Sequence, residues 1–189
     1  MGKSASGKDT IYEKLLKDET LHLLPLIPYT TRPIRTGETE GQEYHFTDEA
    51  GLRRLQLAGK VIEQRTYETV QGPWTYFTVD DGILEKGADI LGIGTLDSYR
   101  KLRDYFGSDR VIPLYIQVDD GLRLERALKR ERKPGNHQYE EMCRRFLADQ
   151  NDFSEERLKE AGISRRFQND DDRSVCIAEV RDYIRNLEE

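Results

Sequence analysis

Several features that would define a class of protein are scarce in this sequence. Its 189 residues include two cysteines and three histidines, without a CxxC pair or metal-ligand spacing, which argues against a disulfide scaffold or a metal site. No apolar run approaches the roughly 20 residues of a membrane helix, and the first residues do not resemble a signal peptide. A net charge of -6 argues against general nucleic-acid binding but allows a local basic pocket. We therefore expect a soluble, cytoplasmic protein.

The hydrophobic pattern predicts strands that alternate with helices. The expected helices cover residues 9–18, 48–58, 96–106, 119–132, 139–160 with a break near Asn151, and 174–187. The expected strands cover residues 23–30, 89–94, 111–118 and 163–168, and strands 61–70 and 75–79 form a hairpin-like pair. This order is typical of an α/β fold with a parallel sheet covered by helices, carrying a small mixed insertion.

A phosphate-binding loop is the first motif, with the spacing Gly-x-x-x-x-Gly-Lys from Gly2 to Lys8. Small residues let backbone N–H groups turn towards phosphate oxygens, the next helix adds its positive end, and Lys8 reaches the outer phosphates. A Gly/Ser-rich turn before an ordinary helix is the alternative. The residues assigned to this phosphate loop and its helix are Gly2, Ser4, Ala5, Ser6, Gly7, Lys8, Asp9 and Thr10. Because the motif normally follows a strand, we expect the first strand of the sheet to be missing.

The segment Thr30–Phe46 contains two arginines separated by a proline-stiffened loop. Arg32 and Arg35 can converge on one phosphate through forked hydrogen bonds, and Tyr44 can add a hydroxyl donor. A charged surface loop is the alternative. The whole segment, TTRPIRTGETEGQEYHF, meets every position of the corresponding guanylate kinase pattern, so together with the phosphate loop the chain resembles the guanylate kinase family.

The resemblance implies a P-loop kinase that uses ATP and Mg²⁺ to phosphorylate GMP. Residues 1–30 and 80–189 would form the core, with a helical lid at about 126–146, and residues 31–79 the acceptor-binding insertion. The resemblance assigns these residues to the acceptor: Arg32, Arg35, Tyr44, Glu63, Tyr76 and Thr78. Glu63 would read the guanine edge, and Asn169 would lie near the donor adenine.

Arginines flank the Pro134-Gly135 turn, as expected of a lid that closes over the donor. Arg126, Arg130 and Arg132 precede it, and Arg144 and Arg145 follow it, with Arg145 aligning better. The residues expected to act in catalysis are Lys8, Arg35, Arg130, Arg132 and Arg145. A solvated helix face with i,i+4 ion pairs is the alternative.

The sequence departs from the family at four further positions. Pro28 replaces a guanine-contacting serine, Gly92 and Gly94 replace acidic residues, with Asp97 further on, and Phe77 replaces a glycine. Pro28, Gly92 and Gly94 leave open a kinase with a different phosphorylated acceptor. The missing first strand and Asp9, which stands in place of the usual Ser/Thr after the lysine, leave open a catalytically silent domain that binds proteins. The sequence does not indicate metal ligands or an oligomeric state.

Overall fold

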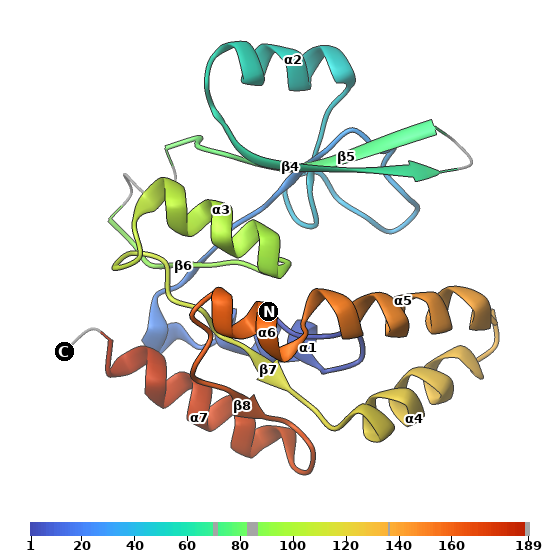
Figure 1. Cartoon of the computed structure of the whole chain (residues 1–189). Helices are drawn as coiled ribbons and strands as arrows, with labels where there is room; N and C mark the ends of the chain where they lie inside the picture. The colour runs from blue at the N-terminus through green and yellow to red at the C-terminus, as the bar shows by residue number, and fades with distance from the viewer. Residues whose placement is uncertain (70–71, 83–86, 136, 188–189) are drawn as a thin grey trace. The chain divides into compact units, whose positions relative to one another are not determined.

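The structure, a computed structural model, describes residues 1–69, 72–82, 87–135 and 137–187 (Figure 1). The chain forms two compact units. The first comprises Met1–His22, Ile93–Asp97 and Ile112–Glu189, and the second comprises Leu23–Gly92 and Ser98–Val111. Valine 70 and glutamine 71, at the predicted hairpin turn, lie outside the described residues.

The first unit is built around a short parallel pair of strands, β7 (Ile116–Gln117) and β8 (Phe167–Gln168). Its helices are α1 (Lys8–Leu16), η1 (Glu19–Leu21), α4 (Asp120–Glu131), α5 (Tyr139–Asp152), α6 (Glu155–Glu160) and α7 (Arg173–Arg185). Figure 1 shows α7 beside β8, and these elements are in contact. Buried residues of α1, β8 and α7, such as Ile11, Phe167 and Val180, supply part of the core.

Polar side chains at helix starts explain where several of these helices begin. The side chains of Asp119, Ser154 and Asp172 accept hydrogen bonds from backbone N–H groups in the first turns of α4, α6 and α7, which satisfies donors that a helix leaves unpaired. The predicted break in the long helix near Asn151 is confirmed, since α5 ends at Asp152 and α6 starts at Glu155. Within the described residues, no helix has the length and apolar character to cross a membrane.

Before α1 the described residues contain no strand, yet Met1 pairs with the chain leading into β7. The amino group of Met1 donates to the carbonyl oxygen of Leu114 at 2.6 Å, and the N–H of Ile116 donates to the carbonyl oxygen of Met1 at 2.9 Å. The residue that precedes the phosphate loop is thereby fixed along β7.

The second unit contains a mixed four-stranded sheet in the order β3-β2-β5-β4. Its strands are β2 (Tyr29–Thr30), β3 (His45–Phe46), β4 (Val61–Thr69) and β5 (Gly72–Val79). Helix α2 (Glu49–Leu57) lies along this sheet in Figure 1 and packs Leu52 against Phe77 and Val79 of β5. A separate parallel pair joins β1 (Leu24–Pro25) to β6 (Ile90–Leu91), and α3 (Leu96–Phe106) follows.

The predicted helices begin and end within two residues of the observed bounds, but most predicted strands were too long. Residues 23–30 yield two short strands, and residues 111–118 yield only β7. Pro25, Pro28 and Pro113 lie in these runs, and proline has no N–H with which to continue a ladder. Hydrophobicity identified the buried segments without revealing where pairing stops.

Phe77 anchors the core of the second unit because its side chain is 0% exposed. We expect Phe77→Ala to lower the free energy of unfolding by about 3–5 kcal/mol, through lost burial and the cavity left behind. Leu57, at the end of α2, is 90% exposed, so Leu57→Ala should change it by less than about 0.5 kcal/mol. Urea unfolding of both variants checks the contrast, and equal losses would contradict this description of the core.

Candidate functional site

The phosphate loop ends at the N-terminus of α1, and glycine is required at both of its ends. Gly7 has a φ of +83° and no side chain caps the helix, so the helix start can bind an anion. A Cβ at Gly7 would lie 2.6 Å from Nδ2 of Asn169, and one at Gly2 would lie 2.6 Å from the carbonyl oxygen of Ile116. Such contacts exclude larger residues without displacement of the backbone.

Asn169, which follows β8, is buried against this loop. Its Nδ2 donates to the carbonyl oxygen of Ser6 at 2.7 Å. Its Oδ1 and the Oγ of Ser6 are buried and have no hydrogen-bond partner among the described residues. Because buried polar atoms are rarely unpaired, this corner of the loop suits a polar ligand or water. The predicted residues Ser6, Gly7 and Asn169 therefore lie together.

Lys8 opens α1 and is only weakly held. Its Nζ lies 3.6 Å from Oδ2 of Asp9, whose side chain is mostly exposed. An exposed ion pair of this kind contributes little stability, so Lys8 can exchange Asp9 for a phosphate at low cost. Asp9 stands where a hydroxyl would follow the lysine in the usual motif.

The outer side of the phosphate loop is bound by α4 and α5, a feature that the sequence did not reveal. The N–H of Ser4 donates to Oδ2 of Asp149 at 2.7 Å, and Nη1 of Arg123 donates to the carbonyl oxygen of Ser4 at 2.9 Å. Arg123 is 1% exposed, and its guanidinium lies 4.7 Å from the ring centre of Phe146. The backbone of Ser4 is thus used for anchoring the loop to these helices.

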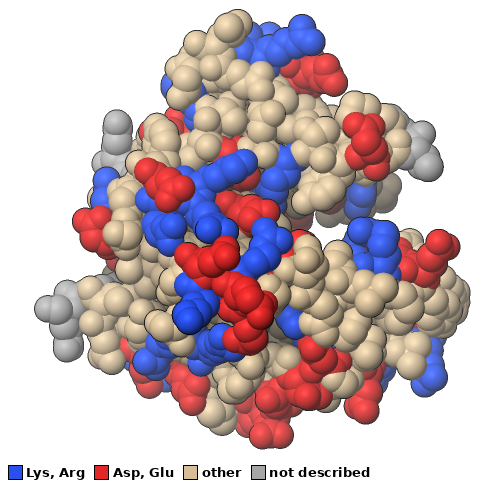
Figure 2. Space-filling view, viewed as in Figure 1, with Lys and Arg blue, Asp and Glu red and all other residues tan. Residues whose placement is uncertain are grey.

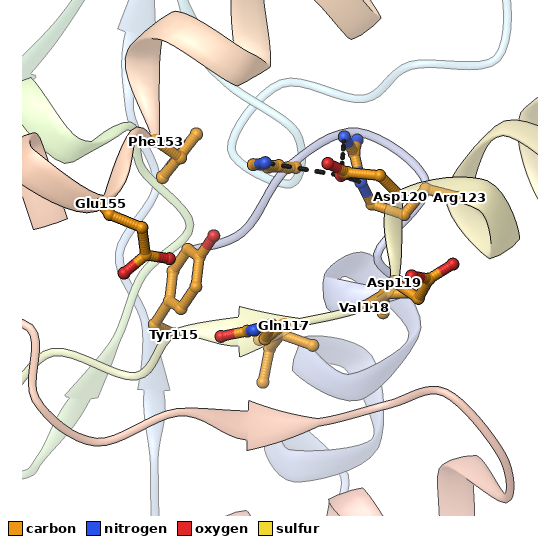
Figure 3. A pocket seen from close by; sticks show the side chains of 10 residues that line it. Tyr115, Gln117, Val118, Asp119, Asp120, Arg123, Phe153 and Glu155 are labelled. Carbon is orange, nitrogen blue, oxygen red and sulfur yellow. Dashed lines mark hydrogen bonds and ion pairs between the residues drawn. The ribbon is translucent and has the colours of Figure 1, made fainter.

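A cavity of 250 Å³ lies next to this anchor (Figure 3). Figure 3 shows Asp120 and Arg123 on one side of it, and Tyr115, Phe153 and Glu155 on the other. Asp120 accepts from Nη2 of Arg123 at 2.7 Å, and Lys3 lies 3.4 Å from the same carboxylate. Burial raises the pKa of Tyr115 to about 12. In the cavity wall Asp120 pairs with Lys3 and Arg123, and Glu155 pairs with Arg166 outside it, which suits a supporting role better than phosphate binding.

The predicted lid arginines form local ion pairs. Arg130 donates to Glu131 at 3.1 Å and Arg145 donates to Glu141 at 2.7 Å, while Arg132 is exposed after α4. Acidic and basic side chains are likewise interspersed on the face drawn in Figure 2. Glu141 can release Arg145 at low cost because this exposed pair is weak, whereas Glu131 is buried and also accepts a hydrogen bond from the N–H of Gln138.

Arg126 contacts the chain that follows β8, and the sequence did not indicate this contact. Its Nη2 donates to the carbonyl oxygens of Asn169 and Asp170 at 2.8 and 2.9 Å. Its Nη1 is buried and has no hydrogen-bond partner among the described residues. The sequence does not distinguish Arg126 from the other arginines of this polar helix. Its contacts with the residues that follow β8 do, and these contacts depend on the tertiary structure.

In the second unit, Arg32 is buried and held in a forked ion pair. Its Nη1 and Nη2 donate to the two carboxylate oxygens of Glu38 at 2.7 and 2.5 Å. The guanidinium carbon lies 4.9 Å from the ring centre of Tyr44 and 5.3 Å from that of Phe46. Arg32 and Tyr44, both predicted to bind phosphate, therefore lie in contact.

Arg35 differs from Arg32 because its side chain is exposed. Its guanidinium lies 5.7 Å from the ring centre of Trp74, and its backbone N–H donates to Glu38 at 2.9 Å. Glu38 therefore fixes the backbone at Arg35 and the side chain of Arg32 together. Glu38 was not among the residues singled out from sequence, although its spacing from Arg32 belongs to the motif.

The strands β4 and β5 place Glu63, Thr78 and Tyr76 on the same sheet. Thr78 is opposite Glu63, and its Oγ1 donates to Oε1 of Glu63 at 2.8 Å. The ring of Tyr76 lies 5.6 Å from that of Tyr44 between centres. The predicted acceptor residues of the second unit, apart from the exposed Arg35, thus form two contact groups, one of Arg32, Tyr44 and Tyr76 and one of Glu63 and Thr78, which together are called the acceptor cluster. Glu63 is also bound by Arg65, at 3.1 Å between Nε and Oε2.

The residues that depart from the family pattern have local structural roles. A Cβ at Gly92 would lie 3.0 Å from Cδ2 of Leu26, so β6 and the chain after β1 approach closely there. Asp97 accepts from Arg157 at 2.8 Å and is thereby used in the first unit. The described residues contain no group of three or more His, Cys, Asp or Glu side chains suited to a metal.

Glu38 gives the acceptor cluster a defined pH dependence. Its hydrogen bond with Arg32 lowers the pKa of Glu38 from 4.5 to about 2. A carboxyl whose pKa is lower in the folded state stabilises the fold above its unfolded pKa, and this contribution is lost as the pH falls through the folded pKa. We expect the unfolding free energies of the parent and Glu38→Gln to differ by a constant amount from about pH 8 to 5. The difference should shrink between about pH 4.5 and 2, as measured by urea unfolding, and a constant difference down to pH 2 would contradict the pairing.

Comparison with known proteins assigns this arrangement to a family. A family model described as guanylate kinase matches residues 1–160. Guanylate kinase from Porphyromonas gingivalis is 28% identical over 185 residues, covering 96% of this chain and 92% of that protein. The enzyme of the same name from Gluconobacter oxydans is 32% identical over 156 residues, covering 80% and 70%.

A solved structure supports the fold. The crystal structure of guanylate kinase from Anaplasma phagocytophilum matches with a TM-score of 0.63 and 22% identity, covering 98% of this chain and 82% of that one. The match confirms the expected P-loop kinase architecture, and the family match extends over the phosphate loop, the Arg32 segment and the helices α4 and α5. The chain belongs to the guanylate kinase family.

Proposed function

We propose that this chain transfers the terminal phosphoryl group of ATP to GMP, forming ADP and GDP, through the residues described above. The phosphate loop carries this proposal, because its glycines, its uncapped helix start and Lys8 together suit a polyphosphate. The residues of the acceptor cluster supply the complementary chemistry, a buried guanidinium and tyrosine hydroxyls suited to a monophosphate.

The first unit would bind ATP. Backbone N–H groups at Ala5–Thr10 would surround the phosphates, while Gly2 and Ser4 hold the loop in place and Asn169 directs its Oδ1 towards the adenine end. Mg²⁺ would enter with ATP and neutralise charge on its phosphates. Asp9, exposed beside Lys8, is the carboxylate of this chain that would hold it.

The second unit would bind GMP. Arg32, Tyr44 and Tyr76 would hold the acceptor phosphate, and the exposed Arg35 would close on it. Glu63 and Thr78 would form the base end of the site. Catalysis of phosphoryl transfer depends mainly on positioning and charge neutralisation, which is what this set of residues provides.

Arginines of the lid helices would neutralise charge on the transferring group. Arg130, Arg132 and Arg145 are the candidates, because Arg132 is exposed and the side chains of Arg130 and Arg145 are 49% and 56% exposed. Arg126 would act nearer the adenine end through its unpaired Nη1. The two free cysteines, Cys143 and Cys176, are consistent with activity in a reducing compartment such as the cytoplasm.

Lys8 provides the direct test of this function. We expect Lys8→Ala to lower kcat/KM for ATP and GMP by at least about 100-fold, because a positioned charge on the transferring phosphates is lost. Lys14 lies exposed on the same helix, so Lys14→Ala is the matched control and should retain parental activity. A coupled assay of ADP formation measures both. Equal activity of Lys8→Ala and the parent would overturn the assigned role, and no turnover by the parent would favour a silent binding domain.

A further inference from the structure

The pairing of β4 with β5 groups four functional side chains on one face of the hairpin. Glu63 and Arg65 are two residues apart on β4, so they point to the same face. Thr78 is opposite Glu63 and Tyr76 is opposite Arg65. This face also carries the contact between Tyr76 and Tyr44. Arg65 therefore belongs to the acceptor cluster, although neither composition nor the family resemblance singled it out.

The carboxylate of Glu63 is enclosed and occupied by its neighbours. The Glu63 side chain is 0% exposed, whereas that of Arg65 is 24% exposed. Oε2 accepts from Nε of Arg65 at 3.1 Å, and Oε1 accepts from Nη2 at 3.3 Å and from Thr78 at 2.8 Å. A forked pair of N–H donors is also what the N1 and amino groups of guanine would offer this carboxylate. Arg65 thus makes the hydrogen bonds to Glu63 that guanine would have to make if Glu63 bound the base directly.

Retention of this pair is favoured over its exchange for a base. Removing one member of a buried ion pair leaves an uncompensated charge and is strongly destabilising. A guanine edge is neutral and would replace only the hydrogen bonds. The member of the pair that remains accessible is the guanidinium, and its Nη1 has no hydrogen-bond partner among the described residues.

We propose that Arg65, held in place by Glu63, is the residue that reads the acceptor base, and that it selects 6-oxopurine monophosphates through their O6 and N7 atoms. The inference rests on the proposed kinase function and changes the role of Glu63 from direct reading to positioning. Arginine donors pair with the O6 and N7 acceptors of guanine in this way, whereas adenine presents an amino donor beside N7.

The location of Arg65 supports this role. Burial raises the pKa of Tyr44, and the positive charges of Arg32 and Arg65 oppose this rise. Arg65 is therefore close enough to influence the tyrosine that lies over Arg32. A monophosphate held by Arg32 and Tyr44 would then have its base within the same cluster, on the face that Arg65 shares.

Inosine monophosphate (IMP) distinguishes recognition of the base by Arg65 from direct recognition by Glu63. It has the O6 and N7 of guanine but lacks the exocyclic amine. We expect kcat/KM for IMP to be within about threefold of that for GMP, and that for AMP to be roughly 5- to 150-fold lower. Direct reading of the amine edge by Glu63 would instead reduce the value for IMP by about 100-fold or more, and that result would overturn the inference.

Variants of Arg65 test whether this residue is responsible for recognition of the acceptor base. Arg65→Lys keeps a positive charge beside Glu63 but loses the planar fork, so we expect GMP and IMP to lose at least about tenfold in kcat/KM equally, with KM for ATP unchanged. A double variant, Glu63→Gln with Arg65→Gln, removes both buried charges and should show the same loss. Arg53, exposed on α2, gives the control Arg53→Lys, which should match the parent. Parental kcat/KM values for GMP and IMP in Arg65→Lys would overturn the inference.

Calorimetric titration with GMP and IMP, without ATP, distinguishes this inference from the proposed function. If the parent transfers no phosphate but binds both nucleotides alike, and Arg65→Lys weakens both, the proposed kinase function fails and the reading by Arg65 stands. If the parent phosphorylates GMP but rejects IMP, the function stands and this inference fails. Absence of both turnover and binding overturns both.

Discussion

The first unit depends on how closely the phosphate loop approaches the strands beside it. The space at Gly2 is limited by the carbonyl oxygen of Ile116, and the space at Gly7 by the side chain of Asn169. These contacts place the start of α1 against β7 and the end of β8, where the dipole and free N–H groups of the helix can meet phosphate. Asp149 and Arg123 extend the same constraint to α4 and α5, on which the predicted lid arginines Arg130 and Arg145 lie.

Among the described residues of the second unit, the buried charged side chains, Arg32 and Glu63, are paired. Arg32 is neutralised by Glu38, and Glu63 by Arg65. The guanidinium of Arg32 contacts aromatic rings, and that of Arg65 is partly exposed. Both are expected of a site that binds an anionic nucleotide. The carboxylates in these pairs orient the arginines that would bind the ligand. A carboxylate therefore positions an arginine at both ends of the proposed acceptor site.

Local chemistry explains how much the sequence could predict. The phosphate loop, the Arg32 segment and all the main helices follow from spacing, periodicity and capping residues such as Asp119 and Ser154. The short strands, the anchor formed by Asp149 and the contact of Arg126 with Asn169 do not, because each depends on residues far apart in sequence. Arg65 was missed for a related reason: only the register of β4 on β5 shows that it covers Glu63.

The proposed activity of this chain is the transfer of a phosphoryl group between nucleotides. Phosphorus NMR of the full chain with ATP, GMP and Mg²⁺ follows every phosphate at once. We expect GDP and ADP to appear in equal amounts while ATP and GMP decline, with little inorganic phosphate, because transfer should outpace hydrolysis. Unchanged spectra, or ADP and inorganic phosphate without GDP, would contradict it.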